Sequence, residues 1–393
     1  MKINIDRVYE HFDELKAINT TYGQGYTRRS LSKEEDKALN WFKEKLKKYG
    51  LYNKTDSIGN TFGKYESNKS NSSPILIGSH LDTVQNGGLY DGALGVLLGL
   101  EVLIKLKEEN VNIKTPIEVV AFRAEEANIL GGTFGSRAFM GQINADKEFN
   151  SKAKEVGYPI KNILDSKNNK QYKKYLEVHI EQGGVLEKED MDIGIVTSIA
   201  GLNRYECMVY GESNHAGTTP MSIRADAMQR AIPIINQIYK EIEKLPENTV
   251  LTIGKLDIYP NQANVIPNEV KFNIEIRSDK TSKMKNLEVK FNQIFNNIQY
   301  ANITKTVEKN PNKMNPFIQK QFEETAKKLG YNYLFLMSGA NHDANSLAKT
   351  IDTGMLFVPS YKGISHHPEE FSSKKDIEKA GNTLLNTILT EIT

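Results

Sequence analysis

Residues 74–107 read PILIGSHLDTVQNGGLYDGALGVLLGLEVLIKLK, and the architecture can be inferred outward from this segment. A short apolar run from Pro74 ends in the polar residues Ser79 and His80, which is typical of a buried strand that delivers side chains at its tip. Residues 92–107 are apolar on most sides and predict a buried helix. The segment therefore predicts a strand followed by a helix in an α/β sheet.

The same alternation continues along the chain. Residues 116–123, PIEVVAFR, predict a second strand that runs directly into the polar sequence AEEAN. Residues 175–181, YLEVHIE, alternate strictly, with apolar side chains on one side and Glu177, His179 and Glu181 on the other. Open α/β sheets build their sites from polar residues at the carboxyl ends of strands, so we expect a site there.

Flanking segments complete the expected domain. A helix is predicted for residues 33–49, with Ser32 and Glu35 as a capping box and Gly50 as its end. Residues 143–174 are polar and are expected to form surface elaboration. Strands are predicted at 333–337 and 354–359, and Ser373 is expected to cap a final amphipathic helix.

From about residue 202 the pattern changes to that of a separate module. A strand, RYECMVYG, precedes the loop NHAGTTPM, a helix near 224–245, strands near 249–258 and 269–277, and a Lys/Asn-rich helix. This β-α-β-β-α order predicts a compact two-layer unit. The predicted fold class is α/β: a mixed-sheet catalytic domain, residues 1–201 and 314–393, interrupted by a smaller α+β domain, residues 202–313.

Composition excludes several classes of protein. The 51 Lys and Arg residues nearly balance 49 Asp and Glu, so the net charge of +2 gives no overall electrostatic reason to bind nucleic acid or an anionic membrane. No run approaches the roughly 18 apolar residues of a membrane span, and the first residues lack a signal-peptide pattern. We expect a soluble, cytoplasmic protein. The single cysteine, Cys207, excludes an internal disulfide and a cysteine-rich zinc site, and is expected to be a core residue.

Histidines are concentrated beside carboxylates and glycines. His11 is expected to be an ordinary surface residue, whereas the other six lie on strands, at strand ends or in turns: His80, His179, His215, His342, His366 and His367. Such a distribution suggests metal ligation or proton transfer.

One constellation combines these histidines with acidic residues. His80 can offer one ring nitrogen to a metal while a carboxylate such as Asp82 fixes the other. Asp91, at the start of the buried helix, could place its two oxygens on two metals. Glu125 and Glu126 are adjacent in an extended segment and point apart, so one can bind metal while the other acts as a base. The alternative is that these groups merely satisfy one another, but charges at the ends of several buried strands favour a site.

Six motifs spread over nearly the whole chain resemble those of one enzyme family. They are GSHLDTVQNGGLYDGALGV (78–96), EEANILGGTFGSRAFMG (125–141), LEVHIEQGGVLE (176–187), GESNHAGTTPMSIRADAM (211–228), PNQANVIPNEVKFNIEIRS (260–278) and FVPSYKGISHHPEEF (357–371). The family is the binuclear metal amidohydrolases, which includes N-carbamoyl-L-amino-acid hydrolases, β-ureidopropionases and allantoate amidohydrolases. These enzymes are relatives of the co-catalytic zinc aminopeptidases, so the resemblance implies an aminopeptidase-like catalytic domain and an inserted dimerisation or lid domain.

The resemblance also implies a role for each site residue. Asp91 would bridge two divalent metals, with terminal ligands His80, Glu126, His179 and His366. Glu125 would be the general base and acid, and Asp82 the carboxylate behind His80. His366 is favoured over His367 because it directly follows Ser365. Zinc or manganese is expected, and cobalt or nickel would suit the same ligands.

The inserted domain and two loops would supply the substrate contacts. His215 would reach across a homodimer to stabilise the oxyanion, and Arg277 would bind a substrate carboxylate. Gln182, Asn264 and His342 would contact the substrate. Asn341 replaces the glycine usual before this last histidine, and we expect Asn341 to keep the turn because asparagine tolerates left-handed geometry.

The implied reaction is hydrolysis of the carbamoyl C–N bond of an N-carbamoyl amino acid, a small anionic substrate, which releases ammonia, carbon dioxide and the amino acid. Allantoate is the alternative substrate, and an aminoacylase or dipeptidase of the same fold comes third. A non-catalytic binding module would have lost ligands, yet every expected ligand is present. A P-loop phosphohydrolase is disfavoured because no phosphate-binding glycine loop with lysine occurs.

Overall fold

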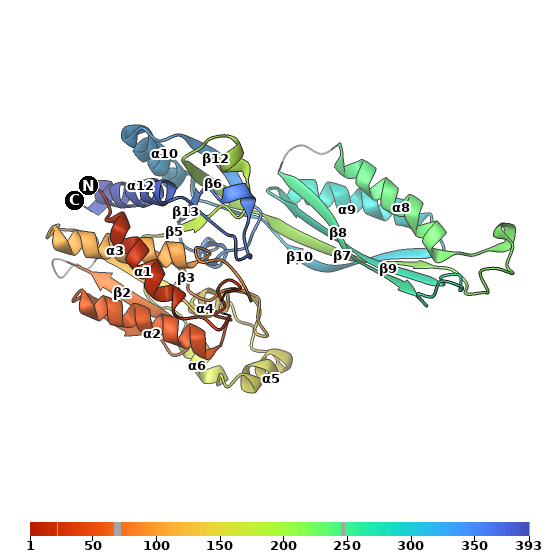
Figure 1. The fold of residues 1–393 in the computed structure, drawn as a ribbon, viewed down its shortest axis with the longest axis horizontal. Coiled ribbons are helices and arrows are strands. Elements are labelled where there is room, and N and C mark those ends of the chain that lie inside the picture. The colour runs from red at the N-terminus through yellow and green to blue at the C-terminus, as the bar shows by residue number, and fades with distance from the viewer. Residues whose placement is uncertain (22, 67–71, 245–247, 393) are drawn as a thin grey trace. The chain divides into compact units, whose positions relative to one another are not determined.

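The computed structural model describes residues 1–21, 23–66, 72–244 and 248–392, which divide into two compact units (Figure 1). Unit 1 comprises Met1–Thr197 and Lys313–Thr393, and unit 2 comprises Ser198–Asn312. The dimerisation or lid role expected for the inserted segment stays a prediction.

Unit 1 is built on a nine-stranded mixed sheet. Its strands, in spatial order, are β1 (Tyr52–Thr55), β2 (Thr61–Tyr65), β4 (Ile117–Phe122), β3 (Ile75–His80), β5 (Lys174–Ile180), β13 (Thr353–Val358), β6 (Ile193–Ile199) and β11 (Asn312–Lys313), with β12 (Tyr333–Ser338) paired to β6. The central strands β4, β3, β5 and β13 are parallel, so their carboxyl ends lie at one edge. His80 is level with Phe122, and His179 is level with Phe357. The α/β fold predicted from the sequence is confirmed.

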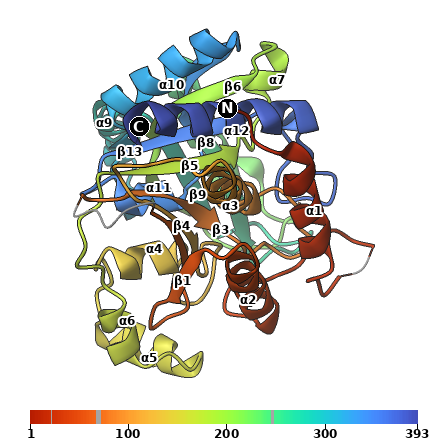
Figure 2. The same cartoon turned by 90° about the vertical axis from the view of Figure 1, so that its left-hand side faces the viewer.

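One layer of helices covers the sheet and shares a single hydrophobic core with it (Figure 2). These helices are α1 (Ile5–Lys16), α2 (Lys33–Lys48), α3 (Ala93–Glu108), α10 (Pro316–Leu329) and α12 (Lys374–Ile392). The core-facing residues of β5 are Leu176, Val178 and Ile180, because alternate side chains of a strand share a face. On the opposite face, α11 (Asp343–Leu347) contacts β5 and β13, and α4 (Phe134–Phe139) contacts α11.

The segment expected to be surface elaboration contains α5 (Lys147–Glu155) and α6 (Ile160–Asp165). The short helix α7 (Val185–Lys188) follows β5, and a 3-10 turn, η2, spans Tyr361–Gly363. Ser373 caps α12 as predicted, because its hydroxyl accepts the Asp376 N–H at 3.1 Å.

One detail of β5 extends the sequence-based expectation, and two further details differ from it. Glu177 and His179 are buried, so the polar face of β5 is covered as completely as its apolar face. Glu181 lies beyond the strand, and its carboxylate accepts the N–H groups of Val185 and Leu186 at the start of α7. The expectation that His11 is a surface residue is wrong: it is 1% exposed and packs edge-on against the ring of Trp41.

The predicted capping box of α2 is half correct. Ser32 Oγ accepts the Glu35 N–H at 3.3 Å, but the Glu35 carboxylate does not return to Ser32. It accepts the N–H of Leu31 instead, at 2.6 Å.

Unit 2 is a four-stranded antiparallel sheet with helices on one face. Its order is β10 (Ala301–Lys309), β7 (Gly201–Tyr210), β9 (Glu269–Ser278) and β8 (Thr249–Tyr259). The helices α8 (Ala227–Ile242) and α9 (Thr281–Asn296) pack on it, and a 3-10 turn, η1, spans Met221–Ile223. Cys207 lies in this core with no exposed surface, as predicted.

One strand of unit 2 was not predicted, and one predicted boundary lies outside the described residues. The sequence did not indicate β10, whose residues alternate between half-buried and exposed and carry three lysines or glutamates near its end. Residue Leu245, where the sequence placed the end of the helix, lies outside the described residues, and the described helix ends at Ile242.

Across the ranges that the structure describes, helices long and apolar enough to span a bilayer are absent.

Candidate metal centre

The carboxyl edge of the parallel strands brings five candidate ligands together around Asp91. His80 is the last residue of β3, His179 is the penultimate residue of β5, and Glu126 follows β4 by four positions. His366 lies in the loop after β13, and Asp91 precedes α3. The strand ends supply these side chains because each apolar strand stops where polar sequence begins.

Asp91 lies between two groups of ligands. Its Oδ1 is 3.1 Å from His179 Nε2 and 3.5 Å from His80 Nε2. Its Oδ2 is 3.1 Å from His366 Nε2, which is in turn 3.5 Å from Glu126 Oε1. The groups His80–Asp91–His179 and Asp91–Glu126–His366 each have their donor atoms within 4.8 Å of one another. One carboxylate is thus common to two sets of donors, and imidazole and carboxylate ligands together suit zinc and other divalent transition metals.

The two buried histidines present Nε2 to this centre because their other ring nitrogens are held. His80 Nδ1 lies 3.1 Å from the Asp82 carbonyl, and His179 Nδ1 lies 2.9 Å from the Ile180 carbonyl. The Nε2 of His179 also accepts the Gly92 N–H at 3.2 Å. These contacts hold Nδ1 of each ring against a backbone carbonyl and direct Nε2 toward Asp91, the usual orientation of a metal-binding histidine.

Gly92 allows this close approach. Its φ is +65°, and a Cβ at this position would lie 2.3 Å from the His80 ring. Only glycine combines that backbone conformation with that space.

Asp82 connects His80 to the glutamate pair. Its Oδ1 lies 3.3 Å from His80 Nδ1 and accepts the Glu125 N–H at 3.2 Å. Its Oδ2 accepts the Glu126 N–H at 3.0 Å and the Ser30 hydroxyl at 2.6 Å. The carboxylate therefore fixes a histidine ring and two consecutive backbone positions at once, which is the orienting role that its sequence position suggests.

The two glutamates diverge. Glu126 points to His366, whereas Glu125 Oε2 lies 3.7 Å from His80 Nε2. Burial raises the pKa of Glu125 well above its ordinary value; Asp343 and Glu126 add to this effect, and His80 opposes it. Burial, together with Asp91, raises the pKa of Glu126 to about 7. A carboxyl group with a raised pKa can both accept and return a proton near neutral pH.

The pKa of Asp91 is shifted in the opposite direction, downward. Burial alone would raise its pKa, but the surrounding His179, His366 and His80 hold it well below its ordinary value. The pKa of His366 is raised to about 9, chiefly by its hydrogen bond to Asp91. The centre thus keeps Asp91 ionised, the form in which a carboxylate binds metal.

The two adjacent histidines face different surroundings. His366 has a φ of +56° and directs its ring to Asp91 and Glu126. The His367 side chain is exposed, and its Nδ1 accepts the Glu369 N–H at 3.2 Å. The geometry brings His366, the residue favoured by the sequence, into the cluster.

Gln182 and His342 were predicted to bind substrate. Gln182, with a φ of +57°, donates from Nε2 to Asp91 Oδ2 at 2.8 Å, and its buried Oε1 has no hydrogen-bond partner among the described residues. His342 is 2% exposed; its Nε2 lies 2.8 Å from Ser338 Oγ and its ring 4.4 Å from the His179 ring. The preceding residue, Asn341, is not among the residues with positive φ, so its place does not call on the left-handed geometry that asparagine tolerates; that the turn is kept stays a prediction.

The remaining three predicted site residues belong to unit 2. His215 is exposed, and its Nδ1 accepts the N–H groups of Gly217 at 3.0 Å and Thr218 at 3.3 Å. Since Nδ1 accepts, the ring proton belongs on Nε2, which is then a hydrogen-bond donor on an exposed side chain. Asn264 lies beside this loop, because its carbonyl accepts the Ala216 N–H at 3.0 Å. Arg277 is half-buried and forms an ion pair with Glu275 at 2.9 Å.

One residue of the centre escaped the sequence reasoning. Glu370 is 5% exposed, and its Oε1 accepts the N–H groups of Tyr90 at 2.9 Å and Asp91 at 3.1 Å. Its Oε2 accepts the Ser365 hydroxyl at 3.1 Å, so it ties the segment before His366 to the segment that carries Asp91. Its position inside the quoted motif FVPSYKGISHHPEEF was the available signal.

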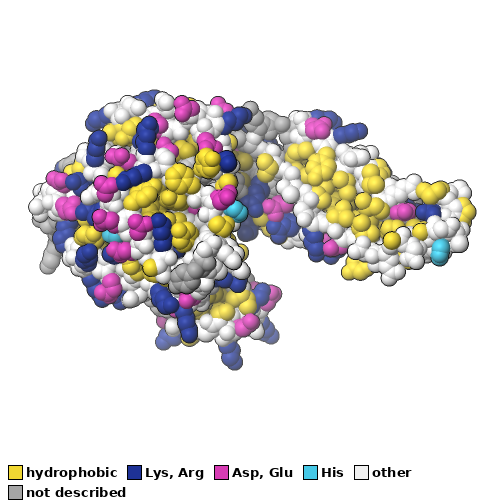
Figure 3. All heavy atoms as spheres, viewed as in Figure 1, with side chains coloured by type: hydrophobic (Ala, Val, Ile, Leu, Met, Phe, Trp, Pro, Cys, Tyr) yellow, Lys and Arg dark blue, Asp and Glu magenta, His cyan; other side chains and the backbone are white. Residues whose placement is uncertain are grey.

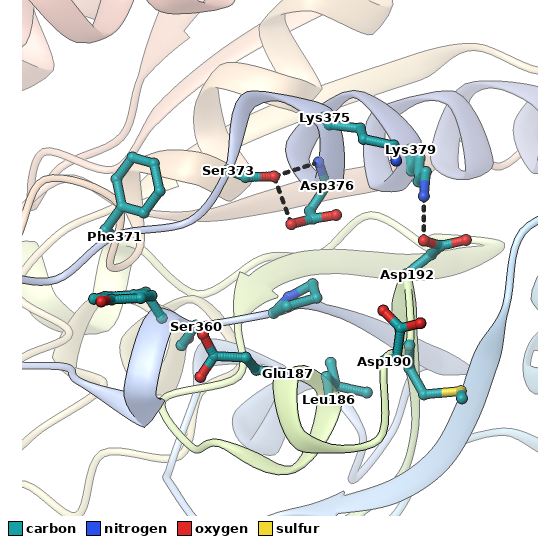
Figure 4. A pocket seen from close by; sticks show the side chains of 13 residues that line it. Leu186, Glu187, Asp190, Asp192, Ser360, Phe371, Ser373, Lys375, Asp376 and Lys379 are labelled. Carbon is teal, nitrogen blue, oxygen red and sulfur yellow. Dashed lines mark hydrogen bonds and ion pairs between the residues drawn. The ribbon is translucent and has the colours of Figure 1, made fainter.

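Two hollows adjoin these segments of unit 1. The larger, of about 620 Å³, borders Glu126 and is lined also by Arg29, Ser32, Val84 and Asn128. The smaller, of about 230 Å³, lies between α7 and the start of α12 (Figure 4). In it, Lys379 pairs with Asp192, and none of the five clustered ligands is among its described lining residues. Of these two hollows, the larger is therefore the one that touches the cluster, at Glu126.

Comparison with known proteins places the chain among hydrolases. The profile of peptidase family M20/M25/M40 matches residues 76–390. The chain is similar to an N-carbamoyl-L-amino acid amidohydrolase of Geobacillus stearothermophilus, with 36% identity over 98% of this chain and 97% of that protein. It is 33% identical to an allantoate amidohydrolase of Bacillus subtilis over 94% of each. The crystal structure of an amidase of the hydantoinase/carbamoylase family from Burkholderia multivorans superimposes with a TM-score of 0.90, at 28% identity, over 99% of this chain and 98% of that chain.

Proposed function

The chain belongs to peptidase family M20/M25/M40, and from this premise we propose that it is a metal-dependent amidohydrolase that cleaves the carbamoyl C–N bond of N-carbamoyl amino acids. Ammonia, carbon dioxide and the free amino acid would be the products. The observation that carries the proposal is Asp91, which faces two sets of donor atoms with its two oxygens while Glu125 lies beside them.

We propose that the residues around Asp91 hold two divalent cations, with His80 and His179 on one side and Glu126 and His366 on the other. Zinc or manganese suits this donor set, and cobalt or nickel would fit it too. Bound there, such cations acidify water and polarise the carbonyl group that is attacked. The backbone-carbonyl contacts of Nδ1 in His80 and His179, which direct Nε2 of both rings to Asp91, support this assignment.

The proton transfers would be carried by Glu125. Its raised pKa suits a group that takes a proton from the attacking water and returns it to the leaving nitrogen. Asp82 supports this role, because it fixes the backbone N–H of Glu125 and so limits the movement of the side chain.

Substrate recognition is assigned to unit 2. His215, with its Nε2 donor, would stabilise the developing oxyanion, and Arg277 would pair with the substrate carboxylate. Asn264, beside the His215 loop, would bind the substrate as well, as would Gln182 and His342 in unit 1. In this proposal Arg277 exchanges Glu275 for the substrate carboxylate.

We further propose that the protein is a homodimer in which His215 serves the partner's site. Unit 2 exposes large apolar side chains on α8 and β8, where hydrophobic surface gathers (Figure 3). They are Ile232, Tyr239, Val250, Leu256 and Tyr259, with exposed fractions from 40% to 58%. Exposed apolar surface of this kind marks an interaction site.

Allantoate is the second candidate substrate, because a relative of that name matches most of the chain. An ammonia-release assay with defined metal would compare N-carbamoyl-L-amino acids, N-carbamoyl-β-alanine and allantoate, with N-acetyl-L-amino acids as the test for aminoacylase activity. We expect the N-carbamoyl-L-amino acids to be turned over best. Preference for allantoate would select the alternative, and a metal-loaded protein that releases ammonia from none of them would refute the carbamoyl assignment.

A further inference from the structure

Glu35 occupies a place that the capping of α2 does not explain. It lies in the first turn of α2 with no exposed surface. Its Oε2 accepts the Leu31 N–H at 2.6 Å, and its Oε1 accepts the Ala124 N–H at 2.5 Å, 89 residues away. Ser32 already caps the helix, so the carboxylate is available for the second segment.

Both backbone N–H groups that Glu35 binds belong to residues in the left-handed region. The φ of Leu31 is +62° and that of Ala124 is +52°. Residues other than glycine are strained in this region of backbone conformation. They adopt it only where surrounding contacts stabilise it. One buried carboxylate holds two of these strained positions.

The strained residue Ala124 directly precedes the functional glutamates. The N–H groups of three consecutive residues are each bound by a buried carboxylate: that of Ala124 by Glu35, and those of Glu125 and Glu126 by Asp82. The left-handed turn lies between the end of β4 and this pair. It therefore helps to direct Glu125 toward His80 and Glu126 toward His366.

Keeping the Glu35 carboxylate ionised at this buried position costs free energy. Burial raises the pKa of Glu35 to about 8 and the negative charge of Asp82 adds to this, while Arg123 and the two backbone N–H groups oppose it. Replacing buried ionised groups by apolar residues of similar volume is often neutral or stabilising. The cost is understandable if the carboxylate is needed to shape the backbone before Glu125.

We infer that Glu35 is a positioning residue for the reaction: its carboxylate holds Ala124 in the left-handed conformation and thereby aims the base Glu125 and the metal ligand Glu126. The inference rests on the proposed function for the roles of the two glutamates. The backbone relationship itself comes from the structure.

The test is a double-mutant cycle between Glu35→Gln and Ala124→Gly. Glutamine offers one carbonyl oxygen in place of two carboxylate oxygens, so it cannot accept both N–H groups. We expect Glu35→Gln to weaken Zn²⁺ binding, measured by chelator competition, and to lower kcat, each by about 10- to 100-fold, with KM changed by less than about 3-fold. Glycine adopts positive φ without strain, so in the Ala124→Gly background the effect of Glu35→Gln should shrink to less than about 3-fold.

Glu44→Gln is the matched control, because Glu44 lies in the same helix, is exposed and pairs only with Lys47 among the contacts in the described chain. It should leave Zn²⁺ affinity and kcat unchanged. If Glu35→Gln does not fold, Glu35→Asp replaces it in the same cycle. Undiminished Zn²⁺ affinity in the single variant, or an equal loss with and without Ala124→Gly, would overturn the inference. Zn²⁺ affinity is measured without substrate. If the protein proves not to hydrolyse carbamoyl compounds, the Zn²⁺ measurement still tests the role of Glu35, so the two failures can be told apart.

Discussion

Nε2 of His366 lies 3.1 Å from Oδ2 of Asp91, and this contact separates His366 from its neighbour His367. His367 instead receives a backbone N–H from Glu369 at 3.2 Å. Two adjacent histidines of the same chemistry therefore have different surroundings, which makes them a matched pair for mutagenesis.

We expect His366→Ala to lose ammonia-releasing activity by more than about 100-fold and to bind less metal, because one donor set would keep only two of its three groups. His367→Ala should retain activity within about 2-fold, since exposed side chains without a functional contact contribute little. Metal content by elemental analysis and initial rates check both. Equal effects of the two substitutions would contradict the assignment of His366.

The variant Glu125→Gln should keep its metal and its fold but lose the proton acceptor. The expected fall in kcat is about 10²- to 10⁴-fold, the usual contribution of a general acid–base group. Thermal unfolding and metal content serve as controls, because glutamine nearly preserves the shape of the side chain. Normal turnover by a well-folded Glu125→Gln protein would rule out Glu125 as the base.

Complementation tests whether His215 acts across a dimer. His215→Ala and Glu125→Gln are each expected to be inactive as purified proteins. If each site uses Glu125 from one chain and His215 from the other, subunit exchange between the two variants should restore about a quarter of the wild-type activity, because half of the dimers would be mixed and each would hold one complete site. An exchanged mixture that stays inactive would place both residues in the same chain.

From the burial of His11 we predict that the stability of the fold depends on pH, independently of catalysis. Burial, with a contribution from Lys45, lowers the pKa of His11 from 6.5 to about 4 in the folded protein. Between these values the unfolded chain binds more protons than the folded chain, so the free energy of unfolding rises with pH from about 4 to 6.5. The contribution is at most about 3.5 kcal/mol, since each pKa unit corresponds to about 1.4 kcal/mol.

Urea unfolding of His11→Phe and wild type at pH 4.5, 5.5, 6.5 and 7.5 checks this expectation. Phenylalanine cannot be protonated, so the difference in unfolding free energy between the two proteins should change steadily below pH 6.5 and stay constant above it. The comparison cancels the pH dependence of every group that both proteins share. A difference that is constant over the whole range would show that His11 does not titrate upon unfolding.

The sequence predicted the parallel core of unit 1 because its strands are apolar runs with polar ends. The runs at β3 and β4 and the apolar helix α3 appear within one or two residues of their expected bounds. The strand β10 was missed although Ala301, Ile303 and Val307 occupy its alternate half-buried positions, because Lys305 interrupts this apolar pattern. His11 could have been placed correctly: Val8, His11, Phe12 and Leu15 recur at helical spacing and form the buried stripe of α1.

For the candidate site, residue types and strand ends nominated His80, Asp91 and the glutamate pair, and the family resemblance added His179 and His366. The contacts among them required the fold. That His366 and Gln182 both approach Asp91 depends on loops more than 90 residues apart from it in sequence. The part played by Glu35 was hidden for a related reason. Its spacing from Ser32 fits a capping box, and only the three-dimensional arrangement shows that its carboxylate continues to Ala124.

Cys207 is the single cysteine of the chain, and it is sealed in the core of unit 2 on β7. A thiol-specific reagent can therefore reach sulfur only when that core opens, and burial further suppresses the reactive thiolate by raising its pKa. The rate of thiol labelling then measures how often the core of unit 2 opens, and it does not depend on the opening of unit 1. A single native atom thus provides a built-in probe of whether the two units unfold together or one after the other.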